Sequence, residues 1–254
     1  MGSLVTLRGV GKSYQSITGD VIEAVKDITF DLEEGEVVAL VGPSGCGKST
    51  ILRMIAGLET PTVGAIEEAR AGDFLIGYIF QDSSLMRWRT VYNNVKLPLE
   101  VLGESKPDRV QRMIDMVGLT GFERQYPNEL SGGMQRRVSI ARALVHEPKV
   151  LLMDEPFTGV DEITKELLQT DLLYIINSLK VTGMLVTHDV EEAAYLADRV
   201  MVMSAHPGTI IEEVKVPLPE VREPIMRTQA PFNECCKRIR EKLQLLTPHR
   251  APMR

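Results

Sequence analysis

The sequence has few cysteines and no long apolar run. Its three cysteines, Cys46, Cys235 and Cys236, form neither a CxxC pair nor a disulfide framework, which favours a reducing compartment. No stretch approaches the ~20 consecutive apolar residues of a membrane-spanning helix, so we expect that the chain does not cross a bilayer by itself. The opening residues, MGSLVTLRGVGKSY, contain no apolar segment of signal-peptide length.

An excess of basic charge is also lacking. The 254 residues include 29 Lys and Arg against 35 Asp and Glu, which gives a net charge of −6. This balance argues against a protein that coats nucleic acid, and 44% apolar with 25% charged residues is typical of globular proteins rather than disordered ones. We therefore expect no nucleic-acid partner.

The first part of the chain predicts strands followed by a turn and a helix. Ile28, Phe30 and Leu32 alternate with polar residues, which is typical of a strand with one wet face. The continuous apolar run at 37–42 indicates a strand that is covered on both faces. An apolar stripe after the next turn stops at Gly57, as at the end of a helix.

The remainder predicts a helical insert and then alternating strands and helices. From Asp82 to about Pro148 the patterns are mostly helical, and one helix is closed by Gly118. Short buried strands follow at 150–154, 184–189 and 199–204, with helical stretches near 161–180 and 190–197. This βαβ rhythm favours an α/β fold with a mostly parallel sheet.

A glycine-rich string lies between a predicted strand and a predicted helix. GPSGCGKS fits the pattern G-x-x-x-x-G-K-[ST], in which the glycines let backbone N–H groups face phosphates. Lys48 adds a cation for the β and γ oxygens, and the Ser49 hydroxyl is a candidate Mg²⁺ ligand. The strand and helix around the string favour this interpretation over an ordinary glycine turn. The candidate phosphate-binding residues are Gly42, Pro43, Ser44, Gly45, Cys46, Gly47, Lys48, Ser49 and Thr50.

Two carboxylates follow the apolar strand VLLM. Because ligands of parallel sheets bind at the carboxyl ends of the strands, Asp154 and Glu155 are candidates for a nucleotide site. Asp154 can hold the Mg²⁺ water shell, and Glu155 is placed to take a proton from an attacking water. Taken alone, the pair also fits a simple solvent-facing strand end.

The string LSGGMQ at 130–135 predicts a second anion-binding helix start. Ser131 is a good N-cap, and Gly132 and Gly133 expose backbone N–H groups beside it. An ordinary helix cap would not explain two glycines at this place, because each costs helix stability.

Together these strings resemble the nucleotide-binding subunit of an ATP-binding cassette (ABC) transporter. GPSGCGKS corresponds to its Walker A motif, VLLMDE to Walker B and LSGGMQ to the signature, while Gln81 and His188 stand at its glutamine loop and switch histidine. The resemblance implies that Tyr14 stacks on adenine; from the residues alone, Tyr14 is an ordinary half-buried tyrosine at a strand end.

The resemblance also implies the organisation of the chain. It predicts an ABC ATPase domain over 1–205, in which 1–81 and 149–205 form the RecA-like core with an N-terminal antiparallel β part. Residues 82–148 are predicted to be the helical subdomain, and 206–254 a C-terminal extension with a strand and a helix.

The implied mechanism needs two cassettes that pack head to tail. Each ATP would lie between one subunit's phosphate loop and the signature residues Ser131, Gly132, Gly133 and Gln135 of the other. Gln81 would link Mg²⁺ and water to the helical subdomain, and His188 would contact the γ-phosphate. Catalysis would rest on Glu155, His188, Lys48 and Gln81, with ATP and Mg²⁺ as cofactors and Ser49, Gln81 and Asp154 as metal ligands.

One loop departs from the usual family pattern. Where Ser-Ala-Leu-Asp is common after Walker B, this chain has Thr158, Gly159, Val160 and Asp161. Asp161, a candidate contact of the second nucleotide site, is retained. We expect that Gly159 loosens the loop and reduces coupling between the two sites.

Residues 83–95 follow Gln81 and contain the only tryptophan of the chain. Trp88 is flanked by Arg87 and Arg89, which suits an interface with the membrane permease; the alternative places Trp88 in the core of the helical insert. The string is similar to one in the nitrate, sulfonate, taurine and bicarbonate importers. That similarity implies import of a small anionic solute, which a periplasmic or lipid-anchored binding protein delivers. It also implies that this subunit lies on the cytoplasmic side of the membrane.

The last residues, 231–254, contain six Lys and Arg against two Glu. They predict an amphipathic helix that packs back on the catalytic domain or docks on a neighbouring subunit or the membrane face. The other class of function that we weighed is a soluble cassette ATPase of DNA repair or cofactor assembly. Only 84 residues separate Gly47 from Ser131, which leaves no room for a long coiled-coil arm.

Overall fold

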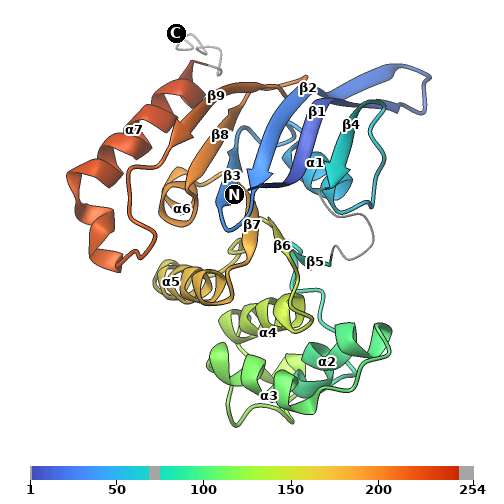
Figure 1. Cartoon of the computed structure of the whole chain (residues 1–254), viewed down its shortest axis with the longest axis vertical. Helices are drawn as coiled ribbons and strands as arrows, with labels where there is room; N and C mark the ends of the chain where they lie inside the picture. Colours follow the sequence, from blue (N-terminus) through green and yellow to red (C-terminus); the bar gives the residue numbers. More distant parts are fainter. Residues whose placement is uncertain (1, 69–74, 246–254) are drawn as a thin grey trace, which may run out of the picture. The chain divides into compact units, whose positions relative to one another are not determined.

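The computed structural model describes residues 2–68 and 75–245, and the chain forms two compact units. The first unit combines Met1–Ala69 with Leu185–Arg254, and the second comprises Arg70–Met184. Figure 1 gives the element labels used below. The finer predicted division at residues 81, 148 and 205 stays a prediction.

An antiparallel sheet forms the N-terminal part of the first unit. Its strand order is β2-β1-β4, from β1 (Ser3–Gln15), β2 (Val21–Glu33) and β4 (Val63–Glu68). Ile28, Phe30 and Leu32 are buried and their neighbours are exposed, so the predicted strand with one wet face is confirmed.

The first unit also contains buried parallel strands. β3 (Val37–Val41) pairs in parallel with β8 (Arg199–Met203), which pairs antiparallel with β9 (Ile210–Lys215). β7 (Thr182–Thr187) runs from the second unit into the first, where the strand order is β7-β3-β8-β9. All five residues of β3 are buried, as the continuous apolar run predicts, and helix α1 (Lys48–Ile55) follows its turn.

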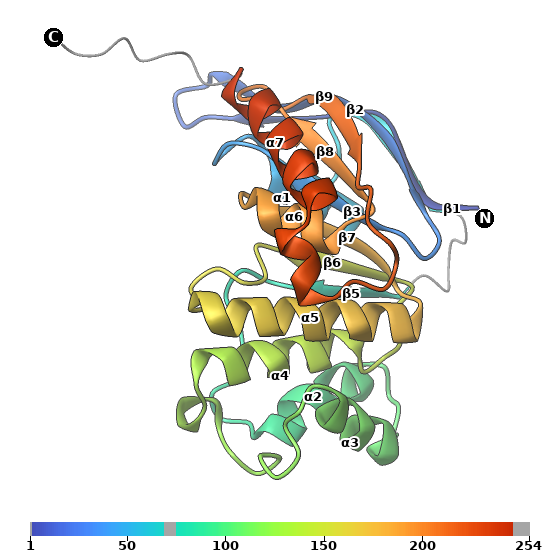
Figure 2. The same cartoon turned by 90° about the vertical axis from the view of Figure 1, so that its left-hand side faces the viewer.

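The second unit is mostly helical, as the patterns from Asp82 to about Pro148 predict. Here β5 (Ile76–Ile79) pairs in parallel with β6 (Val150–Asp154), and β7 is the next strand. Figure 2 shows α4 and α5 lying side by side. The helices of this unit are α2 (Val91–Val101), α3 (Pro107–Met116), the 3-10 turn η1 (Pro127–Glu129), α4 (Gly132–Leu144) and α5 (Glu162–Leu179).

Arg222, from the C-terminal part of the first unit, contacts the end of the short helix α6 (Val190–Leu196). The Arg222 side chain is only 1% exposed and donates to the carbonyls of Tyr195 (2.8 Å) and Ala197 (2.9 Å). It also pairs with Asp198 at 2.7 Å. The last carbonyls of α6 are therefore satisfied by a residue far along the chain.

Helix α7 (Ala230–Gln244) lies beside α6, β8 and β9, as Figures 1 and 2 both show, and it follows a 3-10 turn, η2 (Pro224–Thr228). It buries Phe232, Cys235, Cys236 and Ile239. Burial raises the pKa of both thiols, that of Cys236 to about 12, so these cysteines behave as packing residues. The predicted amphipathic helix is confirmed through Gln244; Leu246 and the residues after it lie outside the described residues.

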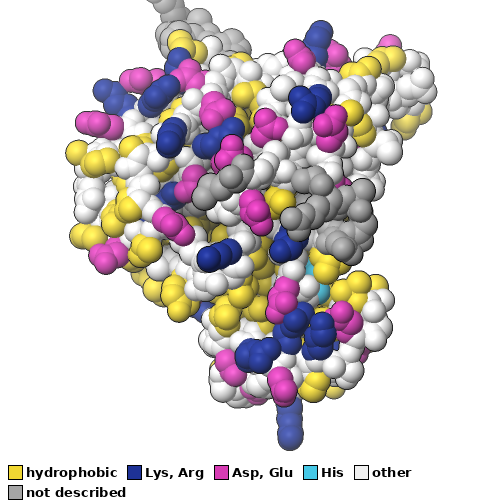
Figure 3. Space-filling model, in the orientation of Figure 1, with side chains coloured by type: hydrophobic (Ala, Val, Ile, Leu, Met, Phe, Trp, Pro, Cys, Tyr) yellow, Lys and Arg dark blue, Asp and Glu magenta, His cyan; other side chains and the backbone are white. Residues whose placement is uncertain are grey.

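The basic side chains of α7 are paired within the subunit. Arg238 and Lys242 lie 2.8 and 2.7 Å from the two carboxylate oxygens of Glu212 on β9, and Arg240 pairs with Glu191 on α6. The two cations lower the pKa of the Glu212 carboxyl. Figure 3 shows positive and negative side chains interspersed over α7 and β9. The structure thus confirms that the helix packs back on its own subunit, and it leaves these charges less available to a membrane.

We expect Ile239→Ala to lower the free energy of unfolding by about 2 to 5 kcal/mol, because the fully buried side chain would leave a cavity under α7. Urea denaturation followed by circular dichroism measures the loss. Lys237→Ala on the exposed face is the control. Equal stability of the two variants would contradict the observed docking of α7.

Candidate nucleotide site

The predicted phosphate loop lies in the first unit, between β3 and α1. Gly45 has φ +78° and Gly47 has φ +98°, a left-handed conformation that favours glycine, and Gly47 is the N-cap of α1. A Cβ on Gly47 would lie 2.3 Å from Val25 Cγ1. The loop can curl before the helix only because these positions lack a side chain.

Lys48 is almost fully buried within this loop. Its Nζ donates to the carbonyls of Gly42 at 2.8 Å and Pro43 at 3.0 Å. The loop therefore holds the ammonium group against its own carbonyls, at the start of the helix whose N–H groups are the expected phosphate donors.

Cys46 is a packing residue of the loop. It is fully buried, and burial raises the pKa of its thiol. A Cβ on Gly42 would lie 2.9 Å from its Sγ, and one on Gly208 would lie 1.9 Å from its carbonyl oxygen. Gly208 is thus a supporting residue of the loop that the sequence pattern did not reveal, because it lies more than 150 positions away.

Two further predicted residues belong to the same unit. The Tyr14 side chain is 38% exposed at the end of β1, and its hydroxyl lies 3.5 Å from Thr50 Oγ1 in α1. The structure therefore brings the predicted base-stacking tyrosine to the phosphate loop helix. His188 is exposed after β7, and the following Asp189 caps α6 by accepting from the N–H groups of Glu191 and Glu192.

The candidate catalytic carboxylates lie in the second unit at the end of β6. Glu155 has φ +43°, a strained conformation for a residue with a side chain. Its Oε2 accepts from Gln81 Nε2 at 3.4 Å and from Thr158 Oγ1 at 3.0 Å. Asp154 is buried and accepts from the Tyr78 hydroxyl at 3.4 Å. The structure thus brings Gln81 and Glu155 together, although 74 positions separate them.

The predicted signature helix begins as expected. The Ser131 side chain accepts from Met134 N at 3.3 Å and caps α4. Gln135 donates to the carbonyls of Pro127 (2.9 Å) and Leu130 (3.3 Å), which brace the turn before the helix.

The start of α4 also lies beside the first turn of α5, since a Cβ on Gly133 would be 2.7 Å from Thr164 Cγ2, whereas one on Gly132 would meet nothing within 4 Å. Asp161 caps α5, and the Thr164 N–H lowers the pKa of its carboxyl.

Sequence reasoning missed the polar side chains by which α4 holds the segment after β5. Arg136 donates to the carbonyls of Phe80 and Gln81, and Ser139 donates to Ser83 O at 2.9 Å. Arg142 donates to Ser83 O and Ser84 O at 2.9 and 2.8 Å. Three polar residues at intervals of three on a helix with a buried apolar side were the available signal, but their backbone partners could not be read from the sequence.

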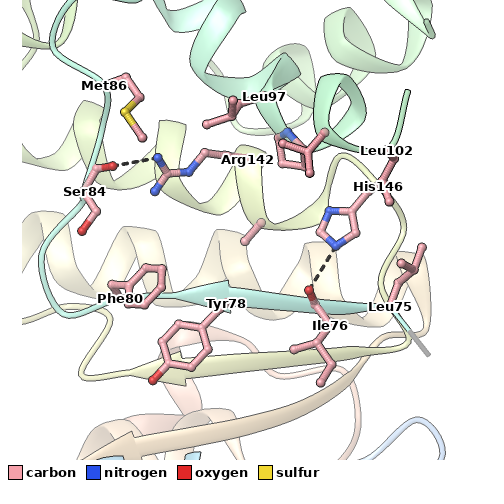
Figure 4. A pocket seen from close by; sticks show the side chains of 13 residues that line it. Leu75, Ile76, Tyr78, Phe80, Ser84, Met86, Leu97, Leu102, Arg142 and His146 are labelled. Carbon is pink, nitrogen blue, oxygen red and sulfur yellow. Dashed lines mark hydrogen bonds between the residues drawn. The ribbon is translucent and has the colours of Figure 1, made fainter. Parts of the chain in front are cut away.

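Residues of β5, α2 and α4, and of the segments next to them, border an apolar groove of about 520 Å³ (Figure 4). His146 Nε2 lies 3.2 Å from Ile76 O, and burial lowers the pKa of its ring, so a neutral imidazole is favoured. Arg142 also borders the groove. The lining residues are Leu75, Ile76, Tyr78, Phe80, Ser84, Met86, Leu97, Pro98, Val101, Leu102, Arg142, Ala143 and His146.

Trp88 follows the segment that borders this groove, and its side chain is 75% exposed. The alternative that placed Trp88 in the core of the helical insert is therefore wrong. Its exposure is confirmed, whereas its contact with a permease stays a prediction.

The loop with the unusual sequence is organised by turns. Thr158 N donates to Glu155 O at 3.2 Å, and Val160 N donates to Phe157 O at 3.3 Å. Gly159 has φ +81°, so this turn favours glycine. Glycine therefore fits the shape of the loop, and the predicted effect on coupling between two sites stays a prediction.

A glycine loop that begins a helix, with separate carboxylates after a buried strand, defines the chain as a P-loop ATPase. The family model described as "ABC transporter" matches residues 25–158. The chain belongs to the ABC transporter family and is an ATP-binding subunit whose ATP hydrolysis is coupled to transport.

Two relatives cover most of the chain. An aliphatic sulfonates import ATP-binding protein, SsuB of Bacillus cereus, is 40% identical over 244 residues, 94% of this chain and 96% of the relative. A nitrate import ATP-binding protein, NrtD of Synechocystis sp., is 47% identical over 208 residues, 79% of this chain and 78% of the relative.

A solved structure, a dimeric post-hydrolysis state of the ATP-binding cassette MJ0796 bound to ADP and Pi, matches with a TM-score of 0.72 and 31% identity. The match covers 86% of this chain and 99% of the MJ0796 chain. The predicted family and the predicted α/β P-loop fold are thereby confirmed.

We expect Thr158→Val to lower the ATPase rate several-fold and to leave ATP binding unchanged, because it removes a hydrogen bond to the Glu155 carboxylate, worth about 1 to 3 kcal/mol. Steady-state kinetics and equilibrium binding separate the two effects. Thr170→Val is the matched control, because it removes a hydroxyl that donates to Glu166 O within α5, away from Glu155. An unchanged rate would show that Thr158 does not position Glu155.

Proposed function

We propose that this subunit drives the import of a small anionic solute through a separate membrane permease. The observation that carries the ATPase mechanism is the strained Glu155, whose carboxylate accepts hydrogen bonds from Gln81 and Thr158. The solute class is supported by the relatives, whose names state nitrate import and import of aliphatic sulfonates.

In this proposal the phosphate loop binds the triphosphate of ATP. Phosphate oxygens would replace the carbonyls of Gly42 and Pro43 as acceptors for Lys48, because a charged acceptor forms the stronger hydrogen bond. Tyr14 would stack on the base. His188 would contact the γ-phosphate and orient the attacking water.

The donor set suits a magnesium ion. The proposed ligands Ser49, Gln81 and Asp154 supply oxygen atoms, the type that Mg²⁺ prefers. Among the described residues no three His, Cys, Asp or Glu side chains gather as a metal site, so phosphate oxygens and water would complete the coordination. The bound ion would neutralise charge on the β- and γ-phosphates during hydrolysis.

Glu155 would act as the general base and accept a proton from water. The dimeric arrangement of the similar cassette MJ0796, bound to ADP and Pi, supports a second cassette, identical or different, as a partner. Ser131, Gly132, Gly133, Gln135 and Asp161 would then meet the nucleotide held by that partner. ATP would join the two subunits, and loss of the γ-phosphate would release them.

Glu155→Gln tests this assignment. We expect the variant to bind ATP, to lose at least about a hundredfold in hydrolysis rate, and to accumulate as a dimer in the presence of ATP. Size-exclusion chromatography with multi-angle light scattering measures the dimer, and phosphate release measures the rate. Hydrolysis at the parent rate would remove Glu155 from this role.

The permease is proposed to insert a helix into the apolar groove between β5, α2 and α4. The lining is mostly apolar, and it includes Ser84 and Met86 from the segment that α4 holds in place. Exposed Trp88 lies close by in the sequence and would extend this contact as an aromatic anchor. Movement of the groove wall would reach Gln81 through the same backbone segment.

We expect Trp88→Ala to reduce recovery of the subunit with membranes of cells that express the complete transporter by about tenfold, while ATP hydrolysis by the free subunit is retained. Tyr174→Ala removes another exposed aromatic side chain, from α5, and is the matched control. Full recovery of the Trp88 variant would contradict the proposed contact.

The complete system would include transmembrane permease subunits and a periplasmic or lipid-anchored solute-binding protein. None of the described helices is both long and apolar enough to span a bilayer. We place the subunit at the cytoplasmic side of the membrane, where ATP is available and the permease offers a docking helix.

A further inference from the structure

The hydroxyl of Tyr14 is held by a carboxylate to which the proposed mechanism gives no role. It donates to the carboxylate of Glu59, which lies just beyond the end of α1, and it lies 3.5 Å from Thr50 in the first turn of that helix. Glu59 is itself fixed, since its N–H donates to Arg53 O at 3.2 Å. The end of β1 is therefore tied to both ends of the helix that follows the phosphate loop.

Two cations surround the Glu59 carboxylate. Lys12 Nζ lies 3.9 Å from Oε2, and Arg53 Nη1 lies 3.7 Å from Oε1. The side chains of Lys12 and Glu59 are only 16% and 22% exposed, so this pair is better shielded from water than most surface ion pairs. Lys12 also donates to Thr60 O at 2.8 Å and lies over the Tyr14 ring, 5.2 Å from its centroid.

Hydrogen bonds to backbone groups also join the end of β1 to the residues that follow α1. Thr62 N donates to Gly11 O at 2.8 Å, and Ser13 N donates to Thr62 Oγ1 at 3.1 Å. Because Thr62 lies only a few residues after the end of α1, these hydrogen bonds fix the end of β1 relative to the helix that follows the phosphate loop. The distance between the tyrosine ring and the phosphate-binding N-terminus is thus set within the first unit.

A tyrosine at an exposed strand end normally rotates about its two side-chain torsions, and ordering the ring on binding costs entropy. Anchoring the hydroxyl at one carboxylate removes this cost in advance, which strengthens binding through preorganisation. Burial and the hydrogen bond to Glu59 raise the pKa of the Tyr14 hydroxyl, so the hydroxyl remains a donor at neutral pH.

We propose that Glu59 is a positioning residue for nucleotide base recognition, which holds the Tyr14 ring in its stacking orientation through the hydroxyl. Lys12 and Arg53 hold the carboxylate in place, and Lys12 covers part of one ring face. This inference rests on the stacking role proposed for Tyr14. It gives Glu59, which lies outside the three nucleotide-binding motifs, a role in recognition of the base.

ADP and inorganic pyrophosphate, titrated into the full chain by calorimetry, separate base recognition from phosphate binding. We expect Glu59→Ala to weaken ADP binding about three- to tenfold, which corresponds to one lost hydrogen bond, and to leave pyrophosphate binding unchanged. Glu59→Gln retains an acceptor oxygen and is expected to keep most of the ADP affinity. Equal weakening of both ligands would mean a purely structural role and would overturn the proposal.

The hydroxyl is tested by a double-mutant cycle. Tyr14→Phe keeps the ring and removes the donor, so we expect a loss of ADP affinity similar to that of Glu59→Ala. The double variant should lose no more than either single variant, because both changes remove the same hydrogen bond. Additive losses would overturn the proposal. Glu67→Ala, which removes an exposed acid of the neighbouring strand β4, is the matched control.

Tyr14→Ala distinguishes failure of this inference from failure of the proposed function. If Tyr14→Ala weakens ADP binding while Glu59→Ala and Tyr14→Phe do not, the stacking role stands and the positioning role of Glu59 is overturned. If Tyr14→Ala leaves ADP binding unchanged, the stacking role itself is wrong, and the inference falls with it.

Discussion

The hydrogen bonds from α4 to the backbone after β5 are the constraint on which the second unit depends. Arg136, Ser139 and Arg142 hold four carbonyls of this segment, so the residues around Gln81 cannot move independently of the signature helix. The four carbonyls are those of Phe80, Gln81, Ser83 and Ser84. One end of α4 carries Ser131, and its other end borders the apolar groove. Helix α4 thereby connects the apolar groove, the proposed permease contact, with Ser131 and Gln81. Both of these residues are expected to meet nucleotide.

Local signals were enough to predict most of the fold. The run at 37–42 is apolar at every position because β3 is covered on both faces, and Gly57 and Gly118 stand at helix ends, where their positive φ angles favour glycine. The phosphate loop and the Ser131 cap were predictable for the same reason. In each case the chemistry is contained in a few consecutive residues.

Contacts between distant segments were not predictable in this way. From the sequence, Gly208 is an ordinary turn residue; only the structure shows its close approach to Cys46. In the same way, Arg142 resembles a solvent-exposed charge on a helix, and only the structure shows the carbonyls to which it donates. Glu59 is similar, because its role depends on the pairing of β1 with the segment after α1. The basic C-terminal helix was ambiguous for the opposite reason: composition describes its charge but not the Glu212 and Glu191 carboxylates that pair with it.

The buried Arg222 has a consequence for the order in which the chain acquires structure during synthesis. Helix α6 has seven residues, too few to be stable by itself, and its last carbonyls are satisfied by a side chain more than 20 positions later. The segment after His188 therefore becomes fully ordered only after the ribosome has released Arg222 from its exit tunnel. The phosphate loop depends on Gly208, which leaves the ribosome before Arg222 does. Of the groups expected to meet nucleotide, this histidine is therefore the last to gain a fixed support.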